Sequence, residues 1–118
     1  MSRPERRGRE AERRTPAPVF AALGDSTRLA LVSTLSRGRP CSITELTRNT
    51  RLTRQAITKH LRVLEHAGIV RSSRRGRESR FRYNPLTIAA VRSYLDRVSL
   101  QWDQALSRLQ ALVERDPS

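Results

Sequence analysis

The sequence predicts a mainly helical fold with one small β-hairpin, arranged as a winged helix-turn-helix that dimerises through a long C-terminal helix. Three observations indicate this fold. A short capped helix followed by a second, amphipathic helix occupies residues 42–68. An Arg-rich hairpin pattern follows at 69–84, and an unbroken heptad repeat fills most of the remainder. The order helix, turn, helix and two-stranded wing is typical of modules that read duplex DNA.

The positive charge of the chain is concentrated on this motif. The 118 residues carry a net charge of +13 at a pI near 11.7. Residues 48–82 hold eleven Arg or Lys and two Glu, so this segment carries nine of the thirteen net charges. Because a charge that served solubility alone would be spread over the chain, this clustering indicates contact with nucleic acid phosphates. The length fits one domain.

Several classes of protein do not fit the sequence. A single cysteine, Cys41, permits no internal disulfide, as expected in a reducing cytoplasm. The longest apolar run, Val19–Leu23, is too short to span a bilayer, and no signal-peptide pattern follows the basic N-terminus. No nucleophile–base pair, P-loop or glycine-rich cofactor loop appears. We therefore expect a cytoplasmic protein that is neither an enzyme nor dependent on a cofactor.

The chain divides into three parts. Residues 1–15 mix six Arg with three Glu and show no apolar periodicity, which predicts a disordered arm. This arm either reaches the DNA minor groove or backbone or is a solvated tail, and the residues leave both interpretations open. Residues 16–84 form the predicted DNA-binding domain. Residues 85–118 form the predicted dimerisation helix and a short tail.

Residues that start and end helices recur through the first half of the domain. Order is predicted to begin near Pro18 with a short apolar helix. Asp25 then caps a helix that ends at Gly38 and places Leu29, Val32 and Leu35 on one side. Ser42 and Glu45 form a capping box that opens a helix over about 42–49. In the turn that follows, we expect Leu52 to act as a buried plug.

The next helix has the features of a recognition helix. Thr53 is its predicted N-cap, and Ile57, Leu61 and Leu64 recur at helical spacing toward the core. The outward residues have side chains that hydrogen-bond base edges or phosphates, at the end of the helix that enters the major groove. We expect DNA contacts from Thr53, Arg54, Gln55, Thr58, Lys59 and Arg62.

The wing is predicted from period-two alternation. Ile69 and Val70 begin one strand, Arg75-Gly76-Arg77 forms the turn, and apolar residues alternate with arginines on the return strand. One face would join the core and the other would meet water or phosphate. The wing residues expected to contact DNA are Arg74, Arg75, Arg77 and Arg80.

The long helix is predicted from a heptad repeat. Asn84-Pro85 caps its start, and apolar residues then recur at alternating intervals of three and four from Ile88 to Leu112. Roughly 29 residues would extend about 43 Å, too far for so small a body to cover. We therefore expect the same helix of a second subunit to pack on Val91, Leu95, Val98, Trp102 and Leu109, and packing within one chain is the alternative.

These motifs together resemble the ArsR family of dimeric winged-helix repressors. The resemblance covers about residues 18–114 and rests on LGDSTRL, on LTRQAITKHLRVLEHAGIV and on the YNP junction after the wing. It implies a homodimer that represses transcription from a palindromic operator until a signal releases it.

The chain departs from the metal-sensing members of that family. Those members carry paired cysteines in the helix before the recognition helix, where this chain has Ser42-Ile-Thr-Glu-Leu-Thr. Others place Asp and His ligands along the last helix, which here contains no His. His60 and His66 lie six residues apart, about 240° around a helix, so one helix cannot offer both to one ion. The sequence therefore predicts no metal site.

Alternative functions remain at this stage. An architectural protein could coat DNA without reading its sequence, although Gln55, Thr58 and Lys59 favour base readout. The long helix could dock onto another protein. A metal- or thiol-responsive repressor is a further alternative, since Cys41 lies just before a helix start, where thiol pKa values are often depressed. Control could come from an organic effector between the long helices and the winged body, or from the amount of protein made.

Overall fold

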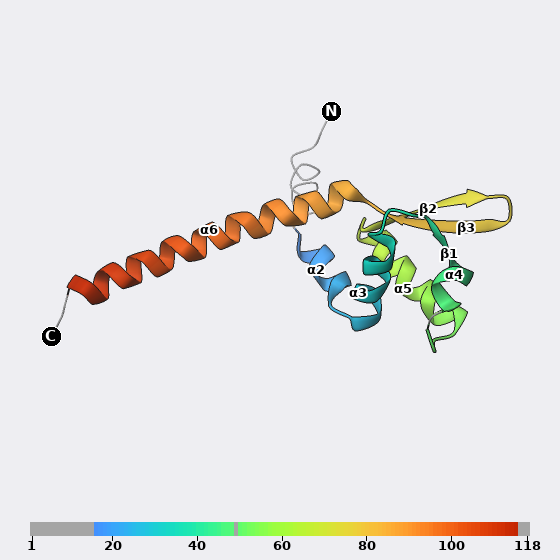
Figure 1. The fold of residues 1–118 in the computed structure, drawn as a ribbon, viewed down its shortest axis with the longest axis horizontal. Coiled ribbons are helices and arrows are strands. Elements are labelled where there is room, and N and C mark those ends of the chain that lie inside the picture. The colour runs from blue at the N-terminus through green and yellow to red at the C-terminus, as the bar shows by residue number, and fades with distance from the viewer. Residues whose placement is uncertain (1–15, 49, 116–118) are drawn as a thin grey trace, which may run out of the picture.

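The computed structural model describes residues 16–48 and 50–115 (Figure 1). The arm predicted for residues 1–15 lies outside the described residues. The predicted order of elements and the winged helix-turn-helix fold are confirmed. The elements are α2 (Ala17–Leu23), α3 (Ser26–Leu35), β1 (Cys41–Ser42), α4 (Ile43–Arg48), α5 (Arg54–His66), β2 (Val70–Arg75), β3 (Glu78–Tyr83) and α6 (Pro85–Arg115).

All four predicted helix caps are present, and three of them open α3, α4 and α5. The Asp25 carboxylate accepts a hydrogen bond from the Arg28 backbone N–H at 3.0 Å. The Glu45 N–H donates to Ser42 Oγ at 3.1 Å, and the Ser42 N–H donates back to Glu45 Oε1 at 3.4 Å. Thr53 Oγ1 accepts from the Ala56 N–H at 3.1 Å. Each of these caps satisfies backbone donors that the first turn of a helix leaves without a partner.

A third strand completes the sheet, whose order is β1-β3-β2. No pattern in the sequence predicted β1. This strand has two residues, too few to show alternation, and it pairs Cys41 with Phe81 in an antiparallel register. The β2–β3 hairpin, called the wing below, pairs Val70 with Tyr83 and closes through Gly76, whose φ of 65° favours glycine.

The core forms where the helices meet the sheet. The predicted inward residues of α5 are fully buried, and Leu35, Ile69 and Phe81 pack with them. Leu29 was predicted to face this core, but it is 52% exposed and Leu31 is buried instead. Apolar residues of α3 occur on every side of the helix. The sequence pattern therefore did not indicate which side would face the core. The prediction that Leu52 is a buried plug is also wrong, because Leu52 is 38% exposed.

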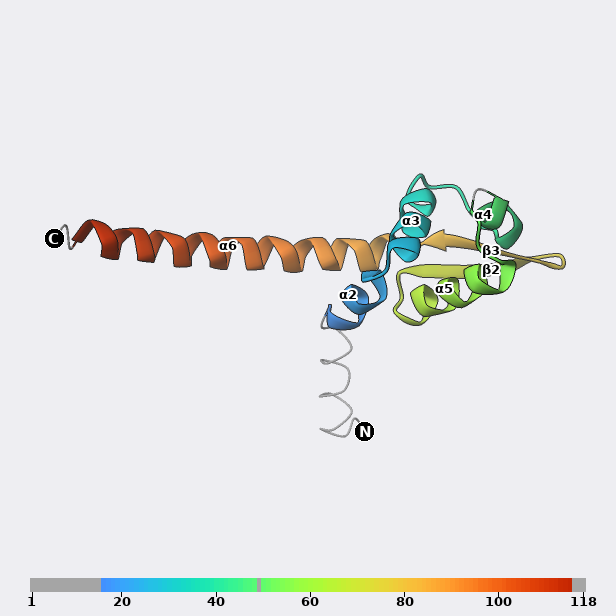
Figure 2. The ribbon, with the colours of Figure 1, turned by 90° about the horizontal axis from the view of Figure 1, so that it is seen from below.

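Helix α6 is anchored at its root and then leaves the body. Asn84 Oδ1 accepts from the Leu86 N–H at 3.1 Å, and Asn84 Nδ2 and Thr87 Oγ1 both donate to the Gly68 carbonyl, at 3.2 and 2.6 Å. In two perpendicular views, no other described element lies beside the C-terminal half of α6 (Figures 1 and 2). No residue of α6 is buried. Among the described helices, none has the length and apolar character needed to cross a bilayer.

Candidate DNA-binding surface

The first two turns of α5 present the polar surface that the sequence predicted. Its members line one open hollow of about 740 Å³: Thr53, Arg54, Gln55, Ala56, Thr58 and Lys59. Arg54, Gln55 and Lys59 are exposed, and Thr58 is half-buried. The buried face of the same helix fixes this orientation, because Ile57 and Leu61 are fully enclosed. The structure therefore brings five of the six predicted contacts of α5 to one hollow, and Arg62 is the one that does not line it.

These side chains differ in how firmly the protein holds them. Arg54 donates to Thr44 Oγ1 of α4 at 2.7 Å, and Thr58 donates its hydroxyl to the Arg54 carbonyl at 2.7 Å. Within residues 16–48 and 50–115, Gln55 and Lys59 make no side-chain hydrogen bond that would compete with a base edge. An amide with both a donor and an acceptor suits adenine, and an ammonium group suits the acceptors of guanine.

Glu65 joins α5 to the wing. Its carboxylate accepts from the Ser72 hydroxyl of β2 and from Arg62 Nη1, the latter at 2.8 Å. The hydrogen bond from Ser72 lowers the pKa of Glu65 from its ordinary value, and the hydrogen bond and charge of Arg62 lower it further. The charge of Arg62, a predicted DNA contact, is thus partly neutralised in the chain itself. Arg62 reaches phosphate only in competition with Glu65.

The wing distributes its arginines over two faces. Directly opposed residues in an antiparallel pair share a face. Arg74, opposite Ser79, therefore lies on the same face as Ser72 and Phe81, whereas Arg75 and Arg80 lie on the other face. Arg77 is in the exposed turn, and Arg80 donates to Glu78 at 3.2 Å. The four predicted wing residues do not form a single cluster.

One arginine pair in the wing was not predicted from the sequence. Arg71 and Arg82 lie directly opposite each other on β2 and β3, and both are exposed. Like charges in directly opposed positions destabilise a hairpin. An anionic partner on that face would relieve the repulsion, so both residues join the candidate surface. The signal was available in the sequence once the hairpin register was known.

Two titratable groups have structural surroundings that bear on function. Burial, followed by the charge of Glu45, raises the pKa of the Cys41 thiol, which contradicts the depressed pKa expected at a helix start. His60 Nδ1 lies 3.3 Å from Arg28 Nη1 and 3.8 Å from Asp25 Oδ2, so it packs against the start of α3. Among the described residues, no three His, Cys, Asp or Glu side chains converge on one point.

The predicted dimerisation residues differ in how they are packed within the chain. Val91 packs against the core of its own chain, whereas Leu95, Trp102 and Leu109 are exposed by 49%, 64% and 58%. Val98 is half-buried. Leu106 and Val113, which follow the seam by one position and widen it, are also exposed large apolar residues. We refer to Leu95, Val98, Trp102, Leu106, Leu109, Leu112 and Val113 as the α6 seam.

Comparisons with known proteins agree with this fold. A family model described as a helix-turn-helix domain matches residues 23–73. Over 103 residues the chain is 34% identical to the HTH-type transcriptional regulator Rv2034 of Mycobacterium tuberculosis, a match that covers 87% of this chain and 92% of that protein.

Solved structures give the same result. An ArsR-like transcriptional regulator from Rhodococcus sp. RHA1 matches with a TM-score of 0.73 and 35% identity, covering 89% of this chain and 95% of that one. The homodimeric winged helix-turn-helix domain of Mb0332 from Mycobacterium bovis matches with a TM-score of 0.62 at 19% identity, covering 84% and 89%. At that identity the second likeness supports the fold alone.

Proposed function

Because the chain belongs to the ArsR family of winged helix-turn-helix transcriptional regulators, we propose that it is a homodimeric, metal-independent repressor of a palindromic operator. Membership makes it a DNA-binding regulator from a family without enzymatic activity. The proposal adds the assembly, the symmetry of the site, the direction of regulation and the independence from metal.

One observation carries the assignment of sequence-specific binding. Gln55 and Lys59 stand exposed on the groove face of α5, beside an Arg54 that Thr44 orients. Base readout requires donors and acceptors at fixed positions, and only a rigid element supplies these. A protein that coats DNA needs cationic side chains alone. The exposed amide of Gln55 therefore supports base readout over simple coating.

The α6 seam supports the homodimer. A monomer would leave a continuous apolar stripe in water, from Leu95 to Val113. The heptad spacing of that stripe fits another helix with the same spacing, which a second copy of the chain supplies. The Mycobacterium bovis domain of the same fold is itself homodimeric. A two-fold symmetric protein matches a palindrome whose half-sites lie one helical turn apart.

Metal independence is supported by the small number of side chains that could bind a transition metal. A tight transition-metal site takes three or four converging soft or imidazole ligands. The chain has one cysteine and two histidines, and His60 packs against Asp25 and Arg28 at the start of α3. A dimer bound over promoter DNA would compete with a polymerase for the same surface, which supports repression as the proposed direction of regulation.

The test begins with selection of binding sites from a random duplex library. The proposal expects enrichment of a palindrome with half-sites about ten base pairs apart, and reduced transcription in vitro from a promoter that contains it. No enrichment would favour the architectural alternative. Increased transcription would refute repression. Stoichiometric, reversible release from the selected site by micromolar zinc, cadmium or arsenite would refute metal independence.

A further inference from the structure

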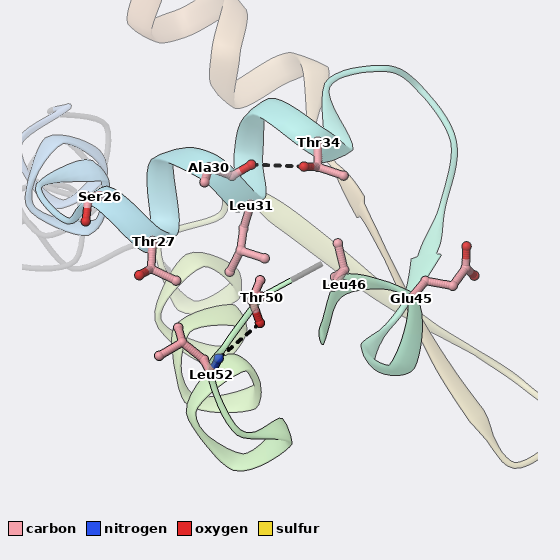
Figure 3. A pocket seen from close by; sticks show the side chains of 9 residues that line it. All are labelled: Ser26, Thr27, Ala30, Leu31, Thr34, Glu45, Leu46, Thr50 and Leu52. Carbon is pink, nitrogen blue, oxygen red and sulfur yellow. Dashed lines mark hydrogen bonds between the residues drawn. The ribbon is translucent and has the colours of Figure 1, made fainter. Parts of the chain in front are cut away.

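A cavity of about 410 Å³ that is open to solvent lies between α3, α4 and the turn before α5 (Figure 3). Figure 3 shows the side chains of Leu31, Leu46 and Thr50 converging on it from three separate segments. The lining residues are Ser26, Thr27, Ala30, Leu31, Thr34, Glu45, Leu46, Thr50 and Leu52. Its volume falls within the range of small-molecule sites.

Leu52, an apolar residue of the turn, is incompletely packed beside the cavity. Leu31 and Leu46 are buried at 4% and 5% exposure, whereas Leu52, which lines the same cavity, is 38% exposed. A molecule in the cavity would contact all three and remove further Leu52 surface from water. Removal of apolar surface is the general driving force for binding at such sites.

The polar groups of the lining define the chemistry of a ligand. Four hydroxyl residues line the cavity: Ser26, Thr27, Thr34 and Thr50. Thr34 and Thr50 already donate to the Ala30 and Thr47 carbonyls, so a ligand would find hydroxyl donors at Ser26 and Thr27 and acceptors at all four. None of the described lining residues is Arg or Lys, although the chain contains 24 of them. Among the described lining residues Glu45 is the one with a charge, and its carboxylate already accepts from Arg39 and Ser42. An uncharged, largely apolar molecule with one hydroxyl fits this lining, and an anion does not.

The cavity wall also sets the start of the recognition helix. Thr50 Oγ1 donates to the Thr47 carbonyl at 3.1 Å and accepts from the Leu52 N–H at 3.3 Å. Leu52 directly precedes Thr53, the N-cap of α5. A ligand held between α3 and this turn therefore contacts the segment that orients Gln55 and Arg54.

We propose that this cavity is an effector site for an uncharged, hydroxyl-bearing apolar molecule, and that its occupation changes operator affinity. The second part rests on the proposed function. An effector acts only through a difference in affinity between the DNA-bound and unbound conformations. Coupling of this kind typically changes affinity by about 5–150-fold.

A second cavity, of about 490 Å³ between α2 and α6, is a weaker candidate for such a site. Its lining includes Arg97 and Tyr94. The ring centroids of Tyr94 and Phe20 lie 5.9 Å apart between the same two helices. It touches no residue of the turn or of the N-terminal half of α5. Occupation there has no direct contact with the groove-facing side chains.

The test uses 2-naphthol as the probe and the full chain as the protein. Binding is followed by amide chemical shifts, with 2-naphthoate as an anionic comparator of the same shape. Ala30→Trp fills the α3–α4 cavity, and Ala90→Trp makes the same change on the α2–α6 cavity. We expect saturable binding to the wild type and to Ala90→Trp, at least tenfold weaker binding to Ala30→Trp, and weaker binding of 2-naphthoate.

Contrary results overturn the proposal in distinct ways. Equal binding to Ala30→Trp, or its loss in Ala90→Trp, places the site elsewhere, and tighter binding of 2-naphthoate refutes the ligand class. If Ala30→Trp does not fold, Leu52→Ser replaces it and should weaken binding several-fold. Saturating 2-naphthol should shift affinity for the selected operator at least about fivefold, and no shift refutes the effector role. Probe binding requires no DNA, so failure of the operator selection would refute the proposed function without affecting the cavity assignment.

Discussion

At the scale of single residues, Gln55 and Lys59 differ from Arg54 and Arg62, whose guanidinium groups donate to Thr44 and Glu65. Under the proposed function, the side chains of Gln55 and Lys59 contact bases. Gln55→Ala and Lys59→Ala should each lower the ratio of specific to random DNA binding. A good base contact contributes about 1–3 kcal/mol of discrimination, or roughly fivefold to 150-fold. Competition titrations with random duplex measure this ratio. An unchanged ratio in both variants would remove base readout from α5.

Arg77 in the wing turn provides the contrasting case. Arg77→Ala should weaken binding to specific and random DNA alike, because a phosphate contact carries no sequence information. It should also make the slope of log affinity against log salt shallower by about one. Affinity measured between low and moderate salt tests both effects. A change confined to the specific site would instead make Arg77 a base-reading residue.

Glu65 gives a pH-dependent prediction. Its pKa is lowered in the folded chain, so its contribution to stability is present above its unfolded pKa and is lost as pH falls through the folded pKa. Urea unfolding between pH 6 and pH 3 should therefore show a smaller loss of stability for Glu65→Gln than for the wild type. The difference at pH 6 should stay below about 1 kcal/mol, because the ion pair is partly exposed. Parallel pH profiles would contradict this account of the Glu65 contacts.

At the scale of elements, the proposed homodimer depends on α6. Trp102 and Leu100 are similarly exposed in the single chain, at 64% and 58%, yet they lie two positions apart and so on nearly opposite sides of the helix. Trp102→Ala should weaken dimerisation by about 3–5 kcal/mol, as expected for a large buried aromatic, whereas Leu100→Ala should not. Sedimentation equilibrium distinguishes them. Equal effects would indicate that the seam is not the dimer interface.

The predictability of each element followed the strength of its local signal. The α5 face and the α6 heptad were predictable because apolar spacing persists over several turns. The two-residue strand β1 was not, because its pairing with β3 depends on contacts distant in sequence. The position of Leu52 was also unpredictable. Its exposure depends on a gap between α3 and α4, which no single-segment pattern encodes.

At the scale of the whole molecule, the charge and the shape separate two tasks. The winged domain holds the excess of positive charge, whereas residues 83–118 sum to zero. In Figure 2 the wing turn and the free end of α6 lie at opposite ends of the molecule. Under the proposed function, DNA contact and subunit contact therefore use different surfaces.

Cys41 belongs to neither of the two proposed surfaces. Cys41→Ser should leave operator affinity within about twofold of the wild type at moderate salt, since its thiol pKa is raised and not lowered.

The most direct test of the central claim is the number of chains bound to the selected operator and to a duplex that contains one half-site. Sedimentation velocity of labelled duplex with the full chain measures both. We predict two chains on the operator, and binding to the single half-site weaker by at least about tenfold, because one subunit of the dimer then has no specific contacts. One chain per operator, with equal affinity for the half-site duplex, would contradict a homodimeric regulator of a palindromic site.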